Sequence, residues 1–288
     1  MKKSENIREL ERLASSQWGL FTTAQSAAIG VGRTQIARME GAGTIECVRR
    51  GTYRYVVGEE TAHVHVKAAW LAAYPKLTAV DRMRMRPFDA VVAGPTAAFL
   101  HGIGDLHEDP YTFIVRTRRQ TVMADLAFHA APLDDADVTF VGTLPVTTME
   151  RTVVDLVRGR HDPSHVERAA RDALRKGADA RRMQSLLEGL APRYAASAGL
   201  LLPLVSKAAE YRENEEILIE AMRELEEIFR KELPSRPPKP GTPRHEAFEA
   251  AIAKFDRVAL GAASPAIAEA ARSLSESAHA LMDTPFDT

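Results

Sequence analysis

Residues 22–40 read TTAQSAAIGVGRTQIARME and predict two short helices joined by a tight turn. Thr22 and Gln25 have the spacing of a capping box, in which a hydroxyl and a side-chain amide each satisfy an orphan backbone group. We expect this first helix to end near Ile29. The second helix runs from Arg33 to Ala42, where a pair of glycines stops it.

The segments on either side complete a winged helix-turn-helix pattern. Ahead of the pair, residues 4–18 carry apolar side chains at helical spacing and predict one more helix. After it, the β-branched and aromatic runs Ile45–Arg49 and Thr52–Val57 predict a hairpin that turns at Arg50-Gly51. A helix-turn-helix binds DNA by placing its second helix in the major groove.

The outward side of that second helix carries residue types suited to DNA, while Ile36 and Met39 face the core. In the major groove, arginine pairs with guanine and glutamine with adenine. Basic and polar residues of a wing hold phosphates, which fixes register more than sequence. The predicted DNA contacts are Arg33, Thr34, Gln35 and Arg38 on the helix, and Arg49, Arg50, Tyr53 and Arg54 on the wing. The alternative is a winged-helix fold that binds protein.

Charge is distributed unevenly along the 288 residues. Residues 1–56 hold nine Lys and Arg against five Asp and Glu, whereas the whole chain has a formal net charge of −1. A basic head on a neutral body fits a polyanionic partner, although chance variation is the alternative. No apolar run approaches the ~20 residues of a membrane span. The charged N-terminus also lacks the apolar core of a signal peptide, so we expect a cytoplasmic protein with no membrane partner.

The remaining sequence predicts a mixed α/β domain over residues 62–200 and a helical extension over 204–288. Together with a head at 1–58, this makes the fold class α+β with a small sheet in the second domain. Strands are predicted at Ala90–Gly94, Tyr111–Thr117, Leu126–Ala130 and Val138–Val141, and His63–Trp70 is either strand or helix. Helices are predicted after Gly94-Pro95, from Thr147 and twice within 163–190. In the extension, a helix over 204–233 is expected to serve packing or dimerisation, and a proline-rich linker at 234–243 separates it from helices near 244–260 and 265–282.

Three motifs resemble the AbiEi-type antitoxins of type IV toxin–antitoxin systems. They are Leu13–Tyr55, with WGLFTTAQ at 18–25 and RRGTY at 49–53, then VVAGPTAAFLHG at 91–102, and LPVTTMERTVVDL at 144–156. The resemblance covers roughly residues 8–190. It implies a head that binds the operator of its own operon as a repressor, and a second domain that counteracts a nucleotidyltransferase-like toxin. At Gly94-Pro95 the sequence departs from the polar pair expected in the family.

Two basic clusters outside the head are candidates for a second contact surface. They are Arg82, Arg84 and Arg86, and Arg116, Arg118 and Arg119. Such a surface suits DNA that flanks the operator, or an acidic or nucleic-acid partner of the toxin. The alternative is charge that guards a strand edge against pairing with another chain.

Residues with catalytic or metal-binding chemistry are scattered rather than grouped, so we expect no enzyme activity, no cofactor and no metal site. His161 and His165 lack a third ligand nearby. Asp135-Ala136-Asp137 has the spacing of a magnesium-binding pair, but the Gly-Ser motif that nucleotidyltransferases place upstream is missing. Arg151 and Asp155 predict an ion pair on a helix surface or, if buried, one that orients the helix against the sheet.

The predicted function is therefore that of an antitoxin and DNA-binding transcriptional autorepressor. One alternative is a winged-helix transcription factor whose second domain senses a ligand or a partner, with no antitoxin role. Another is a nuclease or other enzyme with a DNA-binding head, against which the missing carboxylate motifs argue.

Overall fold

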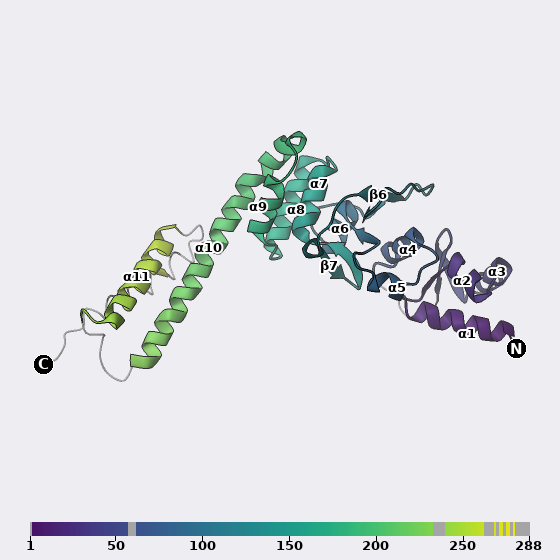
Figure 1. Ribbon diagram of the computed structural model, residues 1–288, viewed down its shortest axis with the longest axis horizontal. Helices are drawn as coiled ribbons and strands as arrows, with labels where there is room; N and C mark the ends of the chain where they lie inside the picture. Colours follow the sequence, from purple (N-terminus) through teal and green to yellow (C-terminus); the bar gives the residue numbers. More distant parts are fainter. Residues whose placement is uncertain are drawn as a thin grey trace. The chain divides into compact units, whose positions relative to one another are not determined.

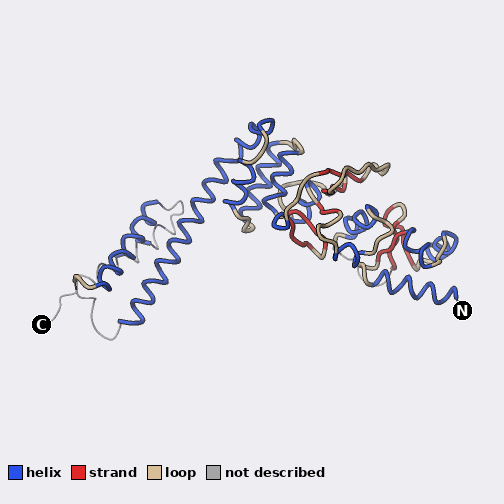
Figure 2. Tube along the Cα trace, viewed as in Figure 1, coloured by secondary structure: helices blue, strands red, loops and turns tan. Residues whose placement is uncertain are grey.

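The computed structural model describes residues 2–56, 62–232 and 240–261, together with single residues between 268 and 279. The chain forms two compact units, Met1–Leu202 and Pro203–Thr288. Figures 1 and 2 show the order of helices and strands along the chain. The fold class is α+β, as predicted: an N-terminal head, a mixed sheet with helices, and a helical C-terminal region.

The head is a helix-turn-helix backed by a small antiparallel sheet. Its elements are α1 (Lys2–Ser15), β1 (Leu20–Thr22), α2 (Thr23–Ile29), α3 (Arg33–Gly41), β2 (Ile45–Arg49) and β3 (Thr52–Tyr55). The strands lie in the order β1-β3-β2. Leu10 and Ala14 of α1 pack with Phe21, Ile36 and Tyr55 in a separate small core, which fixes α3 to the rest of the head.

Local sequence accounts for the start and end of α2. The Thr22 hydroxyl accepts from the backbone N–H of Gln25, and the Gln25 side-chain oxygen accepts from the backbone N–H of Thr22. The predicted capping box is therefore present. Gly30 follows with φ 89°, a left-handed conformation that glycine adopts without a Cβ clash. The prediction that residues 4–18 form one helix was wrong at its end, because Trp18 and Gly19 both have positive φ and turn the chain.

The second domain is built on a mixed five-stranded sheet in the order β6-β5-β4-β8-β7. Its strands are β4 (Ala90–Val92), β5 (Tyr111–Val115), β6 (Leu126–Ala130), β7 (Val138–Val141) and β8 (Leu144–Thr147). Its helices are α4 (Val64–Ala73), α5 (Ala79–Arg84), α6 (Gly94–His101), α7 (Met149–Arg158), α8 (Pro163–Arg175) and α9 (Ala180–Glu188), with short 3-10 turns at Asp135–Asp137 (η1) and Pro192–Tyr194 (η2). The predicted strands are present; β1 and β8 were missed.

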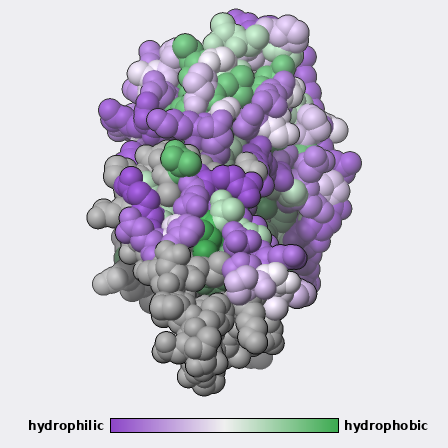
Figure 3. All heavy atoms as spheres, turned by 90° about the vertical axis from the view of Figure 1, so that its left-hand side faces the viewer, coloured by the Kyte–Doolittle hydropathy of each residue, from purple (hydrophilic) through white to green (hydrophobic). Residues whose placement is uncertain are grey.

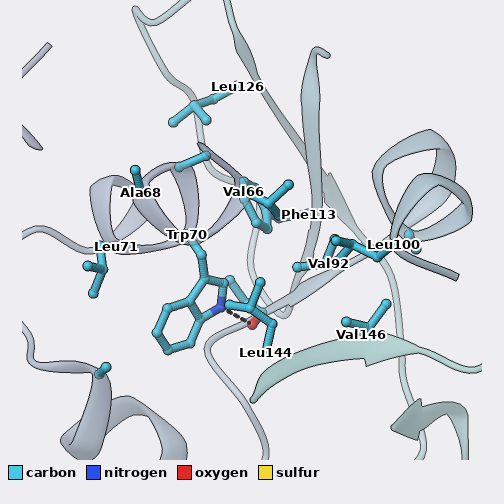
Figure 4. Close-up of a cluster of buried hydrophobic side chains, with 14 of the residues drawn as sticks. Val66, Ala68, Trp70, Leu71, Val92, Leu100, Phe113, Leu126, Leu144 and Val146 are labelled. Carbon is cyan, nitrogen blue, oxygen red and sulfur yellow. Dashed lines mark hydrogen bonds between the residues drawn. The ribbon is translucent and has the colours of Figure 1, made fainter. Parts of the chain in front are cut away.

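The core of the second domain lies between α4 and the sheet. Trp70 of α4 is fully buried, and its indole N–H donates to the Ala90 carbonyl over 3.0 Å. Figure 4 shows it beside Leu144 and close to Val92. The ambiguity at His63–Trp70 is thus resolved as a helix, buried nearly all around, which hid the helical periodicity from the sequence pattern.

Two helices are described in the C-terminal part of the chain, α10 (Ala195–Glu232) and α11 (Pro243–Gly261). α11 matches the helix predicted near 244–260, whereas α10 begins at Ala195, ahead of the predicted start at 204, and continues through Pro203. Most of the predicted linker at 234–243, and all but single residues of the predicted helix at 265–282, lie outside the described residues. In the face shown in Figure 3, hydrophilic residues predominate and apolar ones gather toward the top. Within the described ranges, no helix is long and apolar enough to span a bilayer.

Candidate nucleic-acid interface

The outer face of α3 presents the polar side chains that the sequence placed there. Arg33, Thr34 and Arg38 are exposed and Gln35 is half-exposed. Ile36 is only 2% exposed and belongs to the core of the head, so the helix has one buried apolar side and one open polar side. This is the arrangement in which a recognition helix can reach the edges of bases.

The wing turn lies against the start of α2 and close to α3. Both the backbone N–H and the hydroxyl of Thr23 donate to the Gly51 carbonyl, over 2.9 and 3.0 Å. Gly51 has φ 81°, and a Cβ there would come within 3.2 Å of the Thr23 hydroxyl. Arg33 and Arg50 line a hollow of about 290 Å³ between α3 and this turn, together with Tyr53. Exposed cations from α3 and from the wing therefore share one concave surface.

Two of the three predicted wing arginines are not on that surface. Arg49 forms an ion pair with Asp125 at 2.6 Å, and its side chain is 10% exposed. Arg54 pairs with Glu46 at 2.6 Å, and its side chain is 11% exposed. In the register of the hairpin, Arg49 lies opposite Thr52 and Arg54 opposite Glu46, so both are on the other face of the hairpin from Tyr53. The expectation of a cluster of three free wing arginines was wrong, and Arg50 alone lies exposed.

The head is joined to the second domain by buried polar contacts. Gln25 donates to the Leu77 carbonyl over 2.7 Å, and Gln17 accepts from the Ala79 backbone N–H over 3.1 Å. The two glutamine side chains are also hydrogen-bonded to each other over 2.8 Å. Thr22, fully buried, donates to the Pro75 carbonyl. A buried polar group left without its partner costs about 1–3 kcal/mol, so this network favours one orientation of the head.

Apolar and charged contacts continue the same junction. Trp18 stands edge-on to Trp70 with ring centroids 6.0 Å apart, and its N–H donates to the Thr143 hydroxyl over 2.7 Å. The ammonium of Lys67 lies 5.5 Å from the centre of the Trp18 ring. Leu20 of β1 is buried in the core of the second domain. The sequence marked Gln25 only as a helix cap and Trp18 only as a helix end, because nothing local reveals a partner fifty residues away.

The first of the two predicted basic clusters contains a core residue. Arg82 has no exposed surface and forms a bidentate pair with Asp89, at 2.7 and 3.0 Å. Its guanidinium lies 3.4 Å from the centre of the Trp70 ring and also donates to the Trp70 carbonyl. Burial lowers the pKa of Arg82, while the bonds to Asp89 raise it. Arg82 is therefore no part of a contact surface, whereas Arg84 and Arg86 are exposed.

The second basic cluster lies on the connection 116–125 between β5 and β6. Arg116 and Arg118 are exposed, and Arg119 is half-buried. The Arg119 guanidinium lies 4.2 Å from the centre of the Tyr74 ring and 5.6 Å from that of Phe128. This cluster is thus open to a partner, while Arg119 is held in place by aromatic packing.

The two later motifs come together in the sheet. Val92 of the segment 91–102 pairs with Val146 of the segment 144–156, and the His101 imidazole is 2.7 Å from the Thr147 carbonyl. Burial lowers the pKa of His101, which favours the neutral ring, and this hydrogen bond only partly opposes the shift. Thr148, rather than the predicted Thr147, caps α7 because β8 continues through Thr147. The contacts between these motifs are structural.

Asp137 and Asp155, two carboxylates that the sequence analysis singled out, are held in ion pairs. Asp137 accepts from Arg151 over 2.8 Å and from Arg182 over 2.7 Å. Arg151 also pairs with Asp155 at 2.9 Å, and both side chains are at most 10% exposed. Burial raises the pKa of Asp155, while the positive charge of Arg151 lowers it. Of the two predictions for the Arg151–Asp155 pair, the structure shows the buried one, and it is Asp137 that links α7 to η1 and α9 through Arg151 and Arg182.

An open groove of about 490 Å³ lies on the second domain. Val91 and Ile114 from the sheet form part of its floor, with Phe88 beside them and Arg116 and Asp134 among its polar lining residues. No three His, Cys, Asp or Glu side chains among the described residues are grouped as a metal site requires.

Residues 8–56 match a family model described as "Transcriptional regulator, AbiEi antitoxin". The match spans the head from α1 to the end of the wing, about a sixth of the chain. It confirms the predicted resemblance for the head, and the resemblance of the segments 91–102 and 144–156 stays a prediction. No curated protein matches the chain.

Proposed function

We propose that the chain, whose head is similar to the AbiEi antitoxin transcriptional regulators, is a DNA-binding autorepressor and antitoxin and not a catalyst. The observation that carries the proposal is the open polar face of α3, with Arg33, Thr34, Gln35 and Arg38 above a buried Ile36. The partner is the operator of the chain's own operon, and the protein acts in the cytoplasm.

DNA recognition divides between two sets of side chains. Gln35 and Arg38 read base edges in the major groove, and Arg33 and Arg50, which line the same hollow, bind phosphates. A good bidentate base contact contributes about 1–3 kcal/mol of discrimination, roughly tenfold to a hundredfold in affinity. Phosphate contacts release counterions, so binding weakens steeply as salt concentration rises.

The test is a footprint and a binding titration on the DNA upstream of the operon. We expect Arg38→Ala to weaken binding and to relax base preference at one position, and Arg50→Ala to weaken binding equally on all sequences. Arg168→Ala, an exposed arginine on α8, is the matched control and should bind as the wild type does. An unchanged footprint for both Arg38→Ala and Arg50→Ala would show that α3 does not enter the groove.

The antitoxin role is tested separately by co-expression with the neighbouring gene. We propose that this gene encodes a nucleotidyltransferase-like toxin, and we expect the chain to relieve its growth arrest. If Arg38→Ala still relieves the arrest, DNA binding and toxin neutralisation belong to different surfaces. If the wild type gives no relief, the antitoxin role is wrong.

One observation favours a second candidate function, a transcription factor whose second domain senses a ligand. The groove on the second domain has a volume of about 490 Å³, within the range of small-molecule sites. This candidate predicts that a small molecule changes operator affinity and that Ile114→Trp, which fills the groove, abolishes the response. If the second domain is no sensor, the wild type and Ile114→Trp should have the same operator affinity, with or without the small molecule.

A further inference from the structure

The hairpin formed by β7 and β8 is the most loosely attached part of the five-stranded sheet. β5 pairs with β6 at five positions and with β4 at three, whereas β4 and β8 pair at one, Val92 with Val146 (Figure 4). The hairpin itself has four paired positions and a two-residue turn, Gly142-Thr143, in which both residues have positive φ, as a type I′ turn requires. It can therefore shift as one unit along the seam between β4 and β8.

The open groove of the second domain lies across this seam. Val91 of β4 and Ile114 of β5 are paired in register and line it. They alternate with residues packed beneath α4, so they lie on the opposite face of the sheet. Val138 of β7 lines the groove from the other side of the seam, and the lining residue Phe88 packs edge-on against Phe140 of β7, with ring centroids 5.8 Å apart. A molecule in the groove would therefore contact both the hairpin and the rest of the sheet.

The lining of the groove defines a class of ligand. Its floor is apolar, and its polar lining residues are Arg116, which follows β5, and Asp134 and Asp135, which lie on the crossing from β6 to β7. All three are exposed, and none belongs to an ion pair among the described residues. A ligand that satisfies them has an apolar body, a cationic group for the carboxylates and an anionic group for the guanidinium. Amino acids and short peptides with apolar side chains have all three features.

The crossing that carries the two carboxylates is anchored from the protein interior. Arg151, only 4% exposed, donates to the Pro132 carbonyl over 3.2 Å and to the Asp137 carboxylate over 2.8 Å. These two bonds hold the crossing on both sides of Asp134 and Asp135. The charged rim is thus fixed before a ligand arrives, which lowers the entropy lost on binding.

The turn of the hairpin contacts the head. The indole N–H of Trp18 donates to the Thr143 hydroxyl over 2.7 Å. Trp18 is followed by Gly19 and β1, and β1 pairs with the wing strand β3 over three positions. A shift of the hairpin would therefore reach the sheet that backs the helix-turn-helix.

We propose that the groove is an effector site for a small zwitterion with an apolar body, either an amino acid or a short peptide, and that the β7–β8 hairpin transmits its occupancy to the head. Control of DNA binding by this site rests on the proposed function of the head, whereas ligand binding in the groove does not. A ligand shifts an equilibrium only by binding two states with different affinity. We expect the ligand to change operator affinity about fivefold or more, the usual range of such coupling.

The first experiment measures ligand binding to the full chain without DNA. The probes are L-leucine and L-leucyl-L-leucine, titrated by calorimetry, and the one that binds more tightly identifies the source as free amino acid or peptide. N-acetyl-L-leucine, which lacks the ammonium group, should bind about tenfold more weakly than L-leucine, because a hydrogen bond to a charged group is lost.

The matching variant removes the carboxylates. D134N/D135N should weaken binding of L-leucine about tenfold for the same reason. Asp134 gives η1 no side-chain hydrogen bond, so this variant should keep the fold. D105N/D109N makes the same charge change at two exposed aspartates that do not line the groove, and it should bind as the wild type does.

Tryptophan fluorescence tests transmission through the hairpin without DNA. The chain has two tryptophans, and Trp70 is fully buried, whereas Trp18 is half-buried against the hairpin turn. We expect the probe that binds more tightly to change the fluorescence of the wild type and of Thr143→Ser, which keeps the hydroxyl. Thr143→Ala should bind the probe with unchanged affinity but lose most of the fluorescence change.

The outcomes separate this inference from the proposed function. If neither probe binds, if D134N/D135N binds as the wild type does, or if Thr143→Ala keeps the full fluorescence change, the inference is overturned. If the wild type binds a probe but no operator DNA, the proposed function fails and the ligand site stands. If it binds operator DNA with the same affinity with and without the probe, the effector role is wrong and the proposed function stands.

Discussion

The outer face of α3 and the junction between head and second domain contain the same residue types in opposite surroundings, exposed on α3 and buried at the junction. On α3, Arg33 and Arg38 are exposed and Gln35 is half-exposed. At the junction and beneath α4, Gln25 and Arg82 are buried and fully engaged with protein groups. The comparison teaches that a basic or amide side chain in this chain is a candidate for DNA only where no internal partner claims it. Variants that pair a more deeply buried residue with a less buried one of the same type therefore separate the two uses.

The largest contrast is expected between Arg82 and Arg84. Arg82→Ala leaves Asp89 without its partner beside a fully buried cavity, and breaking such a pair costs about 3–5 kcal/mol. Arg84→Ala, on the exposed side of α5, should change the free energy of unfolding by less than about 0.5 kcal/mol. Urea denaturation measures both. Equal effects would mean that Arg82 is not held as the structure describes.

Gln25 and Gln35 give the next contrast. Gln25→Ala removes the capping-box partner of Thr22, leaves the Leu77 carbonyl without its donor, and leaves the Gln17 side-chain amide with only its bond to the Leu20 carbonyl, which should cost about 2–3 kcal/mol. Gln35→Ala should leave stability unchanged and alter only operator preference. Thermal unfolding and a binding titration on the two variants separate the roles. A stable Gln25→Ala protein would contradict the assignment of this network to the junction.

Arg49 and Arg50 are neighbours with opposite surroundings. Arg49→Ala should cost about 1 kcal/mol, because its partner Asp125 is partly exposed and solvent weakens the pair. Arg50→Ala should leave stability unchanged but weaken DNA binding. A double-mutant cycle of Arg49 with Asp125 isolates the pair, and we expect a coupling energy of about 1 kcal/mol. A coupling energy of zero would show that the Arg49–Asp125 ion pair does not help to hold the connection 116–125 to the wing.

The smallest effect at neutral pH is expected for Tyr55 and Tyr53. Burial raises the pKa of Tyr55 to about 12, above the ordinary value of 10. The folded state therefore disfavours the phenolate, and the free energy of unfolding should stay level below pH 10 and fall as pH rises from 10 to 12. Tyr55→Phe should make that fall shallower, whereas Tyr53→Phe, less deeply buried, should change it less. Chemical denaturation at a series of pH values measures this difference. The prediction is wrong if the free energy of unfolding of the two variants depends on pH in the same way.

Most elements of the head were predictable because their signals are local, whereas β1 was missed and the end of α1 was predicted wrongly. The capping box of Thr22 and Gln25, the glycine after α2, and the two-residue turn at Arg50-Gly51 each act within a few residues. The second domain was harder. β8 lies within LPVTTMERTVVDL, where the proline and the following helix cap hid a strand whose pairing partners, β4 and β7, are set by the whole sheet.

The DNA candidates divide in the same way. Periodicity alone placed Ile36 inward and Arg38 outward on α3, since a helix with one apolar stripe has only one way to pack. For Arg49 and Arg82 the charge was evident from the sequence, but the partners Asp125 and Asp89 were not.

By itself, then, the amino-acid sequence determined the helix-turn-helix, its caps and the polar face of α3, because these depend on contacts within one or two turns of chain. Only the tertiary structure decided which arginines remain open. Arg49 meets Asp125 and Trp18 meets Thr143 across long stretches of chain, and such pairings depend on how the head and the second domain pack together.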